Sequence, residues 1–463
     1  MMLTVLHDMT TLRTRHLIGA FLLTAALLSR PTLALAQTAD PLGPLVREAL
    51  RTNLGLEAER IGERRAVADV HAARALFLPA LDLQSRYSRL DGVPNLGDLI
   101  NPAYAALNGL LGENRFPTNL DITLPQRHDS RLELRQPLFN AAIFANYSAA
   151  RARADGQTFA RRAAARRLAA DVQTAYLSEA SARRAADIYA SALTLVQENE
   201  RVAERLVAAG SAIPEAVFRA RADRSEIEQQ LAEARQRHSA AARVLNQILR
   251  RPLDAAIDVI PDSAFERPLA IAEDSAVAHA IATREELGQV DAGIRTGQAG
   301  VRAATAAYLP SIAVALDYGF QGRDLAFRST QDYWVASVVV SWNLFNGGGD
   351  AARRSAATLE VDRARTLRQD LEDRIGLEVR VAYEAATVAR AALATADDRL
   401  AAARRTFELV RRRYEEGAAS PIELVDARTA LTSAELNRVI TGYQYAMRYV
   451  DLERAAALRD ITP

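Results

Sequence analysis

Two hydrophobic patterns alternate along this chain. Four short segments alternate apolar and polar positions, which is the period of a β-strand. These segments lie at residues 81–90, 130–139, 311–320 and 334–344. Two much longer segments, residues 141–209 and 350–416, contain no proline and repeat apolar residues at steps of three and four, which predicts helices. The order of two strands, a long helix and a second helix occurs twice.

Each long helix is expected to be one arm of a helical hairpin. In the second, a heptad seam follows Leu393, Ala396, Leu400, Ala403, Phe407, Val410 and Tyr414. Such a helix would be roughly 100 Å long at 1.5 Å per residue. The chain then turns at Gly210 or Gly417, and a proline four residues later opens a return helix. The return helices are expected over Pro214–Leu249 and Pro421–Leu458.

The two halves are copies of one unit, because the turn glycines Gly210 and Gly417 lie 207 residues apart and other short sequences recur in the same order. The first repeat is expected over residues 37–250, a proline-containing linker over 251–275, and the second repeat over 276–460. The recurring pairs are Phe77-Leu78-Pro79 with Tyr308-Leu309-Pro310, Leu138-Phe139-Asn140 with Leu344-Phe345-Asn346, and Tyr176 with Tyr383.

The N-terminus reads as an export signal. Arg13 and Arg15 precede an apolar stretch at residues 17–28, and Ala34-Leu35-Ala36 offers a cleavage site. The stretch is too short to cross a bilayer as a helix, so residues 1–36 are expected to be removed. The alternative is a buried helix of a cytosolic protein.

Composition excludes several classes of function. The net charge of +1 offers no electrostatic basis for binding nucleic acid. There is no cysteine, which excludes disulfides, thiol catalysis and a lipidated N-terminal Cys. Histidines are few and lack metal-ligand spacing, and no catalytic arrangement of side chains emerges. We therefore expect no enzyme, no cofactor and no metal site.

The strands have one apolar and one polar face. Alternation of this kind over about ten residues is typical of outer-membrane strands, although a soluble β-sandwich has it too. The face expected to contact lipid carries Ile312, Val314, Leu316, Tyr318, Val338, Val340, Trp342, Leu132 and Leu134. The face expected to line a barrel lumen carries Arg131, Glu133, Arg135, Ser337, Ser341 and Asn343. Four strands cannot close in lipid, so strands of several copies must be pooled.

In the order of these doubled markers, the mature chain resembles the TolC-like outer membrane efflux protein family, the outer membrane channels of tripartite efflux or type I secretion systems. The resemblance implies a mainly α fold with a membrane β-barrel: a long α-helical coiled-coil tunnel, four strands per protomer and a twelve-stranded barrel in a homotrimer. It places the protein in the outer membrane of a Gram-negative bacterium, extending into the periplasm. It also implies a periplasmic adaptor (membrane fusion) protein and an inner-membrane pump of RND or ABC type.

The resemblance assigns roles near the two turns. Glu423 and Asp426 match acidic residues that form a selectivity constriction, and in a trimer they would make two carboxylate rings. The alternative is a solvated helix N-terminus whose dipole favours acidic side chains. Tyr414 matches a position in the periplasmic gate, and Glu215, near the first turn, is an expected partner in closing that gate.

Further residues near the turns follow from the same resemblance. Ala419 stands where a gating arginine is expected, and the basic run at residues 411–413 is a candidate substitute. The alternative is that this run is a solvated helix face. The expected adaptor contacts are Gly210, Ser211, Ala212, Gly417, Ala418, Ala419 and Ser420.

Two hypotheses remain at the level of the sequence. The first is a channel that exports small molecules or secreted protein; the second is a non-conducting coiled-coil protein that tethers the outer membrane to periplasmic partners. The polar strand face favours the channel. The segment 91–129 is expected to be an exposed loop with its own apolar stretch at Ala103–Leu111, and the sequence assigns it no role.

Overall fold

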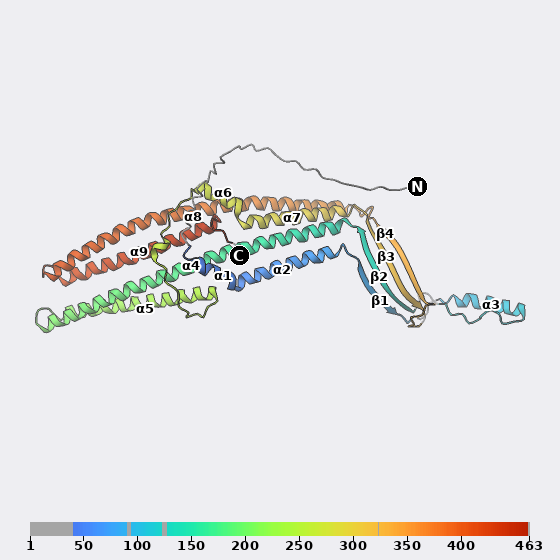
Figure 1. The fold of residues 1–463 in the computed structure, drawn as a ribbon, viewed down its shortest axis with the longest axis horizontal. Coiled ribbons are helices and arrows are strands. Elements are labelled where there is room, and N and C mark those ends of the chain that lie inside the picture. Colours follow the sequence, from blue (N-terminus) through green and yellow to red (C-terminus); the bar gives the residue numbers. More distant parts are fainter. Residues whose placement is uncertain (1–39, 90–93, 123–126, 323, 462–463) are drawn as a thin grey trace, which may run out of the picture. The chain divides into compact units, whose positions relative to one another are not determined.

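The computed structural model of the chain describes residues 40–89, 94–122, 127–322 and 324–461. The expected export signal at residues 1–36 lies outside this described part. Helices dominate the described part, and its four strands form one sheet, so the predicted mainly α fold with four strands per protomer is confirmed (Figure 1). No described helix is long and apolar enough to cross a membrane.

The two repeats contain the same succession of elements. The first consists of α1 (Gly43–Thr52), α2 (Leu54–Ala75), β1 (Ala80–Tyr87), α3 (Gly97–Leu111), β2 (His128–Phe139), α4 (Ala141–Ala208) and α5 (Glu215–Leu249). The second consists of α6 (Glu273–Thr283), α7 (Glu285–Ala306), β3 (Ser311–Gly322), β4 (Asp332–Ser341), α8 (Gly349–Glu415) and α9 (Pro421–Ala455), after a short 3-10 turn at Asp262–Phe265. The helix α3 is an addition of the first repeat.

The long helices start and stop where local chemistry favours it. Asn140 caps α4, its side chain accepting a hydrogen bond from the backbone N–H of Ala142 at 3.0 Å. Both α4 and α8 end at turns whose glycines, Gly210 and Gly417, have positive φ angles of 70° and 73°. A backbone of this hand is accessible to glycine without steric cost, which explains the recurring glycine.

Helices of the two repeats pack against one another through small residues and a few large ones. α4 lies along α5, α7 and α9, and α8 lies along α7 and α9. The larger core cluster, near the middle of α4, includes the fully buried Tyr176 and Leu177 together with Leu245 of α5. The Tyr176 hydroxyl donates to the carbonyl of Asp258 at 3.1 Å and accepts from the N–H of Ile260 at 2.8 Å, tying the linker to α4.

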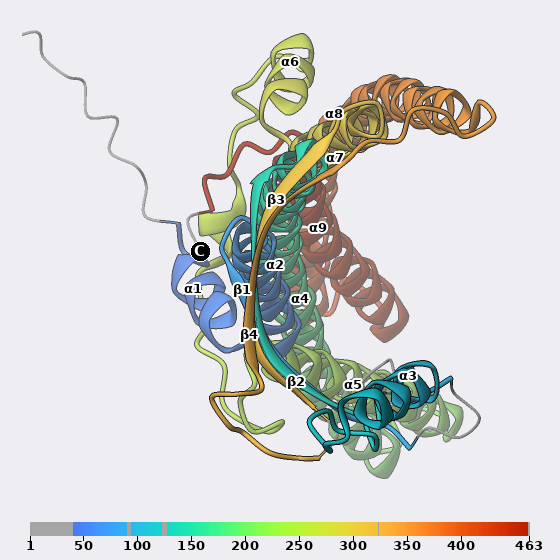
Figure 2. The same ribbon diagram turned by 90° about the vertical axis from the view of Figure 1, so that its right-hand side faces the viewer.

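The sheet has the antiparallel order β1-β2-β3-β4, and its register separates the two classes of side chain. Leu132 pairs with Tyr318 and Leu134 with Leu316, so these residues share one face. Arg131 and Glu133 alternate with the leucines and therefore lie on the other face. Figure 2 shows the sheet as one curved layer. β1 and β4 are its two edges.

The fourth strand is shorter than expected. β4 ends at Ser341, so Trp342 and Asn343 lie beyond the ladder that assigns the other positions to a face. The Trp342 indole instead donates to the carbonyl of Tyr308 at 3.1 Å. The Asn343 amide donates to Asp350 at 2.6 Å, at the start of α8. These two side chains join the strand to the helices rather than extending the sheet, which corrects the expected strand end at Leu344.

Candidate functional site

The two glycine turns are built in the same way. In the first, the N–H of Ser211 donates to the carbonyl of Leu206 at 2.8 Å. In the second, the N–H of Ala418 donates to the carbonyl of Arg413 at 2.7 Å. A bond of this span around a left-handed glycine is the Schellman motif, which satisfies carbonyls that a helix end leaves free. The repeated sequence therefore gives two helical hairpins with equivalent tips.

Only the second turn has a side-chain lock. Ser420 caps α9, and Glu423 completes a capping box by bonding back to the N–H of Ser420 at 3.1 Å. Arg413 of α8 donates to the carbonyl of Ala418 at 2.9 Å and lies 3.6 Å from the Glu423 carboxylate. At the first turn, Pro214 caps α5 without any side-chain hydrogen bond. The two tips therefore differ in chemistry although their backbones match.

The hydrogen bonds of Glu423 affect its ionisation. Bonds from the backbone and then the side chain of Ser420, helped by the nearby Arg413, hold the pKa of Glu423 below its ordinary value. The carboxylate is exposed and carries its charge at neutral pH.

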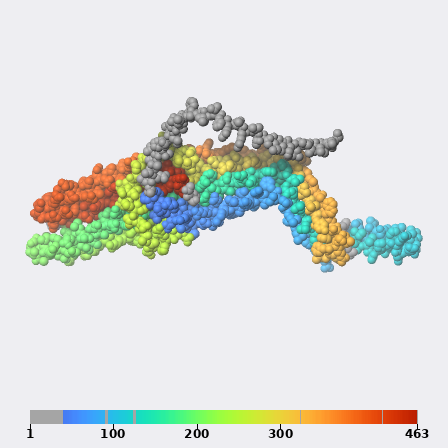
Figure 3. Space-filling model, in the orientation of Figure 1, coloured from blue at the N-terminus to red at the C-terminus, as the bar shows by residue number. Residues whose placement is uncertain are grey.

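The two hairpins, α4 with α5 and α8 with α9, stand side by side and enclose a cleft near their tips (Figure 3). Two cavities of about 820 and 500 Å³ share lining residues and together form this hairpin cleft. Nearest the tips it is lined by Glu215 of α5, Tyr414 of α8 and Asp426 of α9. Farther from the tips, apolar side chains such as Leu195 and Leu436 line it.

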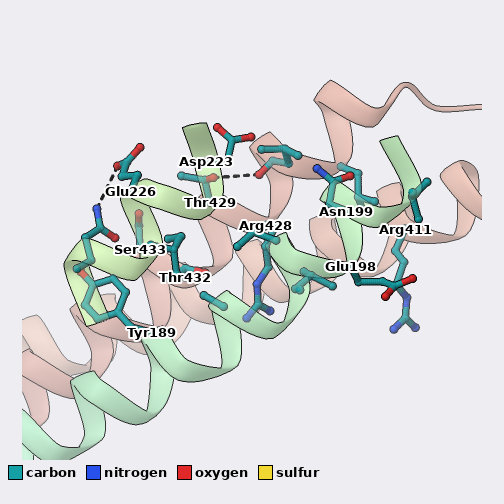
Figure 4. Close-up of a pocket in the computed structure, with 18 of the residues that line it drawn as sticks. Tyr189, Glu198, Asn199, Asp223, Glu226, Arg411, Arg428, Thr429, Thr432 and Ser433 are labelled. Atoms are coloured by element: carbon teal, nitrogen blue, oxygen red, sulfur yellow. Dashed lines mark hydrogen bonds between the residues drawn. The ribbon is translucent and has the colours of Figure 1, made fainter. Parts of the chain in front are cut away.

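An acidic group on α5 faces this cleft. Asp223 and Glu226 line its wall opposite Thr429 and other polar side chains of α9 (Figure 4). Burial raises the pKa of Asp223, and the negative charges of Glu226 and Asp426 raise it further against the opposing effect of Arg219. Arg219, Arg411 and Arg428 also line the cleft, but acidic side chains from both hairpins outnumber them.

Three of the four predicted gate residues meet at one place. Tyr414, Asp426 and Glu215 line the tip end of the hairpin cleft, although Glu215 is about two hundred residues distant in sequence. Glu423 does not line either cavity and instead folds back onto Ser420. Its observed contacts are those of a helix N-terminus, the alternative that the sequence had left open.

The arginines expected to substitute for the gating arginine have partners within their own hairpin. Arg413 holds its own turn, as described above, and Arg411 lies 3.7 Å from Glu415 one helical turn away on α8. Neither contact joins the two hairpins. The residues at the turn itself, from Gly210 to Ala212 and from Gly417 to Ser420, lie at the far end of the hairpins from the sheet (Figure 1).

Asp223 and Glu226 were missed at the level of the sequence. They have the same three-residue spacing on the first return helix as Glu423 and Asp426 have on the second, but only the second pair was assigned a role by the family resemblance. What the sequence did not supply was the pairing of α5 with α9 across the cleft. Within the described ranges, no cluster of three or more metal-ligating side chains occurs.

The second half of the chain matches a known family. Residues 276–458 match the family described as outer membrane efflux protein. Over 197 residues the chain is 31% identical to Protein CyaE of Bordetella pertussis, and this match covers 41% of the present chain and 40% of CyaE. The chain thus spans less than half of the length of this curated relative.

The fold is similar to those of solved outer membrane channels. The Campylobacter jejuni CmeC outer membrane channel superposes with a TM-score of 0.73 at 19% identity, covering 90% of this chain and 85% of that one. The open-state Neisseria gonorrhoeae MtrE outer membrane channel superposes with a TM-score of 0.73 at 20% identity, covering 90% and 89% of the two chains. At this identity the likeness concerns the fold.

Proposed function

Because residues 276–458 match the outer membrane efflux protein family and the described chain has a fold similar to that of such channels, we propose that this protein is an export channel of the outer membrane. Three copies would pool their strands into one twelve-stranded barrel, and their helices would form a tunnel through the periplasm. The cargo would be small molecules or secreted protein.

The sheet carries this proposal. Its apolar face, which includes Leu132, Leu316 and Val338, suits contact with lipid. Its opposite face, with Arg131 and Glu133, suits a water-filled lumen. The edges β1 and β4 both need partners, because an open edge in hydrocarbon leaves backbone groups without hydrogen bonds. Pairing β1 of one copy with β4 of the next satisfies both edges at once.

The remaining strand positions fit the same arrangement. Ile312, Val314, Tyr318, Val340 and Leu134 share the apolar face by register. Arg135, Ser337 and Ser341 share the polar one.

The tips are proposed to contact a periplasmic adaptor that joins the channel to an inner-membrane pump of RND or ABC type. The small residues Ser211, Ala212, Ala418 and Ala419 leave room for another helical hairpin to approach closely. Ala418→Trp should abolish export while the trimer, measured by native mass spectrometry, persists. Retained export in this variant would remove the tip from the contact.

The charge of the cleft is proposed to select cations at the periplasmic end. Asp426, repeated by threefold symmetry, would form a ring of carboxylates. Asp426→Asn should therefore lower cation over anion preference and weaken block by divalent cations in planar bilayers. Glu423 needs two variants, because it has a charge and a capping role. Glu423→Gln removes the charge and keeps an amide able to complete the capping box, whereas Glu423→Ala removes both.

The same recordings discriminate among the hypotheses. Loss of preference in both Glu423 variants assigns its charge to the selectivity ring. Loss in Glu423→Ala alone assigns it to the cap. Unchanged preference and block in Asp426→Asn exclude the proposed ring. The unmodified protein should conduct ions. A trimer that inserts into the bilayer without conducting would instead support the second hypothesis, a non-conducting protein that tethers the outer membrane to periplasmic partners.

A further inference from the structure

Helix α3 has an apolar side that nothing in the described chain covers. Leu96, Leu99, Ala103, Ala106 and Leu110 recur at steps of three and four along it. We call these five residues the α3 stripe. Leu99 and Leu110 are 78% and 86% exposed, so most of each side chain faces solvent. This spacing is that of a coiled-coil seam.

Part of the opposite side of α3 is held by contacts within the chain. Asn101 exchanges two hydrogen bonds of 2.8 Å with the backbone of Leu120. Asn108, which is buried, donates to the carbonyl of Phe116 at 2.7 Å and accepts from its N–H at 2.9 Å. The ring of Tyr104 packs on that of Phe116 at 5.2 Å. The segment that follows α3, with Phe116 and Leu120, therefore packs against this side of the helix and leaves the stripe facing away.

The stripe suits contact with copies of itself. Asp98, in the first turn, is the only charged residue within α3, so equivalent helices meet no repulsion along the stripe. A helix whose outer face is meant for water normally carries charges there. A contiguous apolar surface of this kind marks an interaction site.

The position of α3 in the chain selects the partner. It is inserted between β1 and β2 and extends beyond the tips of the strands (Figure 1). β1 is an edge of the sheet, where the proposed trimer brings in the next copy. Every copy therefore holds its α3 at the same rim of one closed ring. Three equivalent helices that touch along one stripe must meet on the threefold axis, which is also the axis of the pore.

We propose that the α3 helices of three copies associate through the α3 stripe as a coiled-coil cap over the outer mouth of the channel. This rests on the proposed trimeric channel. With 15 residues, α3 offers only about two heptads, a length that is marginal for helices free in solution. Attachment to the rim raises the effective concentration of the helices, so they associate there without becoming a permanent plug.

The natural absence of cysteine makes disulfide trapping the test. Ala103→Cys places a thiol on the stripe, and Ala105→Cys places one on the same helix, also exposed but on the other side. A disulfide forms only when the two Cα atoms approach within about 7 Å. In outer membranes oxidised with copper phenanthroline, Ala103→Cys should give a dimer on non-reducing gels, since three thiols make one bond and leave one free. Ala105→Cys should remain monomeric on the same gels.

A functional readout accompanies the gel. Conductance of the oxidised Ala103→Cys channel should fall, and it should recover on reduction, while Ala105→Cys is unaffected. The proposed cap would be overturned by any of three results: equal cross-linking of both variants, no cross-linking of Ala103→Cys, or cross-linking of Ala103→Cys to a different protein. Native mass spectrometry of both variants separates this failure from failure of the trimer: a trimer without the cross-link removes only the cap, whereas a monomer removes the proposed function.

Discussion

At the scale of single residues, two carboxylates of the return helices α5 and α9 differ in environment. Glu423 is exposed, is bonded to Ser420, and has a lowered pKa. Asp223 is half-buried, faces other acids, and has a raised pKa because of desolvation and their charge. Folding therefore favours the ionised form of Glu423 and disfavours the ionised form of Asp223.

The raised pKa of Asp223 predicts a pH-dependent gain from removing its charge. The folded chain retains a proton on Asp223 above the ordinary value of 3.8, where the unfolded chain has released it. Its contribution to stability therefore falls as pH rises through that window, and stays reduced above it. Asp223→Asn should raise the thermal midpoint at about pH 7 and leave it nearly unchanged at about pH 3.

The matched control is Asp398→Asn, which alters an exposed aspartate on α8. It should shift the thermal midpoint little at either pH. If the thermal midpoint of Asp223→Asn at neutral pH is equal to or below that of the parent protein, the charge of Asp223 does not destabilise the fold.

At the scale of elements, the hairpin turns require glycine because of their left-handed backbone conformation and not because of side-chain packing. A Cβ added at Gly417 would meet no atom within 4 Å, yet φ is +73° there. The same holds at Gly210, with φ of +70°. The requirement for glycine at these turns is therefore conformational.

Gly417→Ala should destabilise the second hairpin by about 1–2 kcal/mol through left-handed strain. Gly376→Ala is the control, because Gly376 lies inside α8 and an added Cβ would make ordinary contact with Val277 at 3.9 Å. That change should stabilise by about 0.5–1 kcal/mol. Thermal unfolding gives both signs, and hydrogen exchange at residues 413–420 locates the loss; equal effects of the two changes would refute the conformational argument.

At the scale of the whole molecule, a buried arginine links three helices. Arg284, whose side chain is 8% exposed, caps the start of α7 and pairs with Glu286 at 2.7 Å. It also pairs with Glu378 of α8 and donates to the carbonyl of Ala455 at the end of α9, at 3.3 Å. Arg284 therefore joins the hairpin of α8 and α9 to α7, the helix that leads to the sheet.

Arg284→Ala should cost about 3 kcal/mol, because it removes a buried guanidinium from Glu286 and from the carbonyl of Ala455. Glu378 keeps its ion pair with Arg454 at 2.9 Å, and both carboxylates are about a third exposed, which limits the loss. Arg380→Ala provides the comparison: Arg380 also bridges α8 to two acids, Glu273 and Asp274, but on the surface. Its loss should cost much less, because exposed ion pairs contribute little to stability. The midpoint of thermal unfolding distinguishes them, and similar losses would show that burial does not set the strength of the Arg284 network.

Much of the architecture was readable from the sequence because it is periodic. The strands and the long helices carry their own repeat of apolar positions, so each segment specifies its type without its neighbours. The turn glycines were equally readable, because few residues other than glycine adopt their φ. Less readable were α3, which carries Pro102 and reads as a loop, and the end of β4, where Trp342 and Asn343 turn to the helices.

What the sequence determined by itself was therefore local: two copies of one unit, two-faced strands, rods of helix and the turns that reverse them. What only the tertiary structure decided was which charged groups face one another. Asp223 meets the field of Asp426 across some two hundred residues of chain, and Glu423 turns away to cap its own helix. Periodicity describes the face of one element, whereas the environment of a charge depends on which other element covers that face.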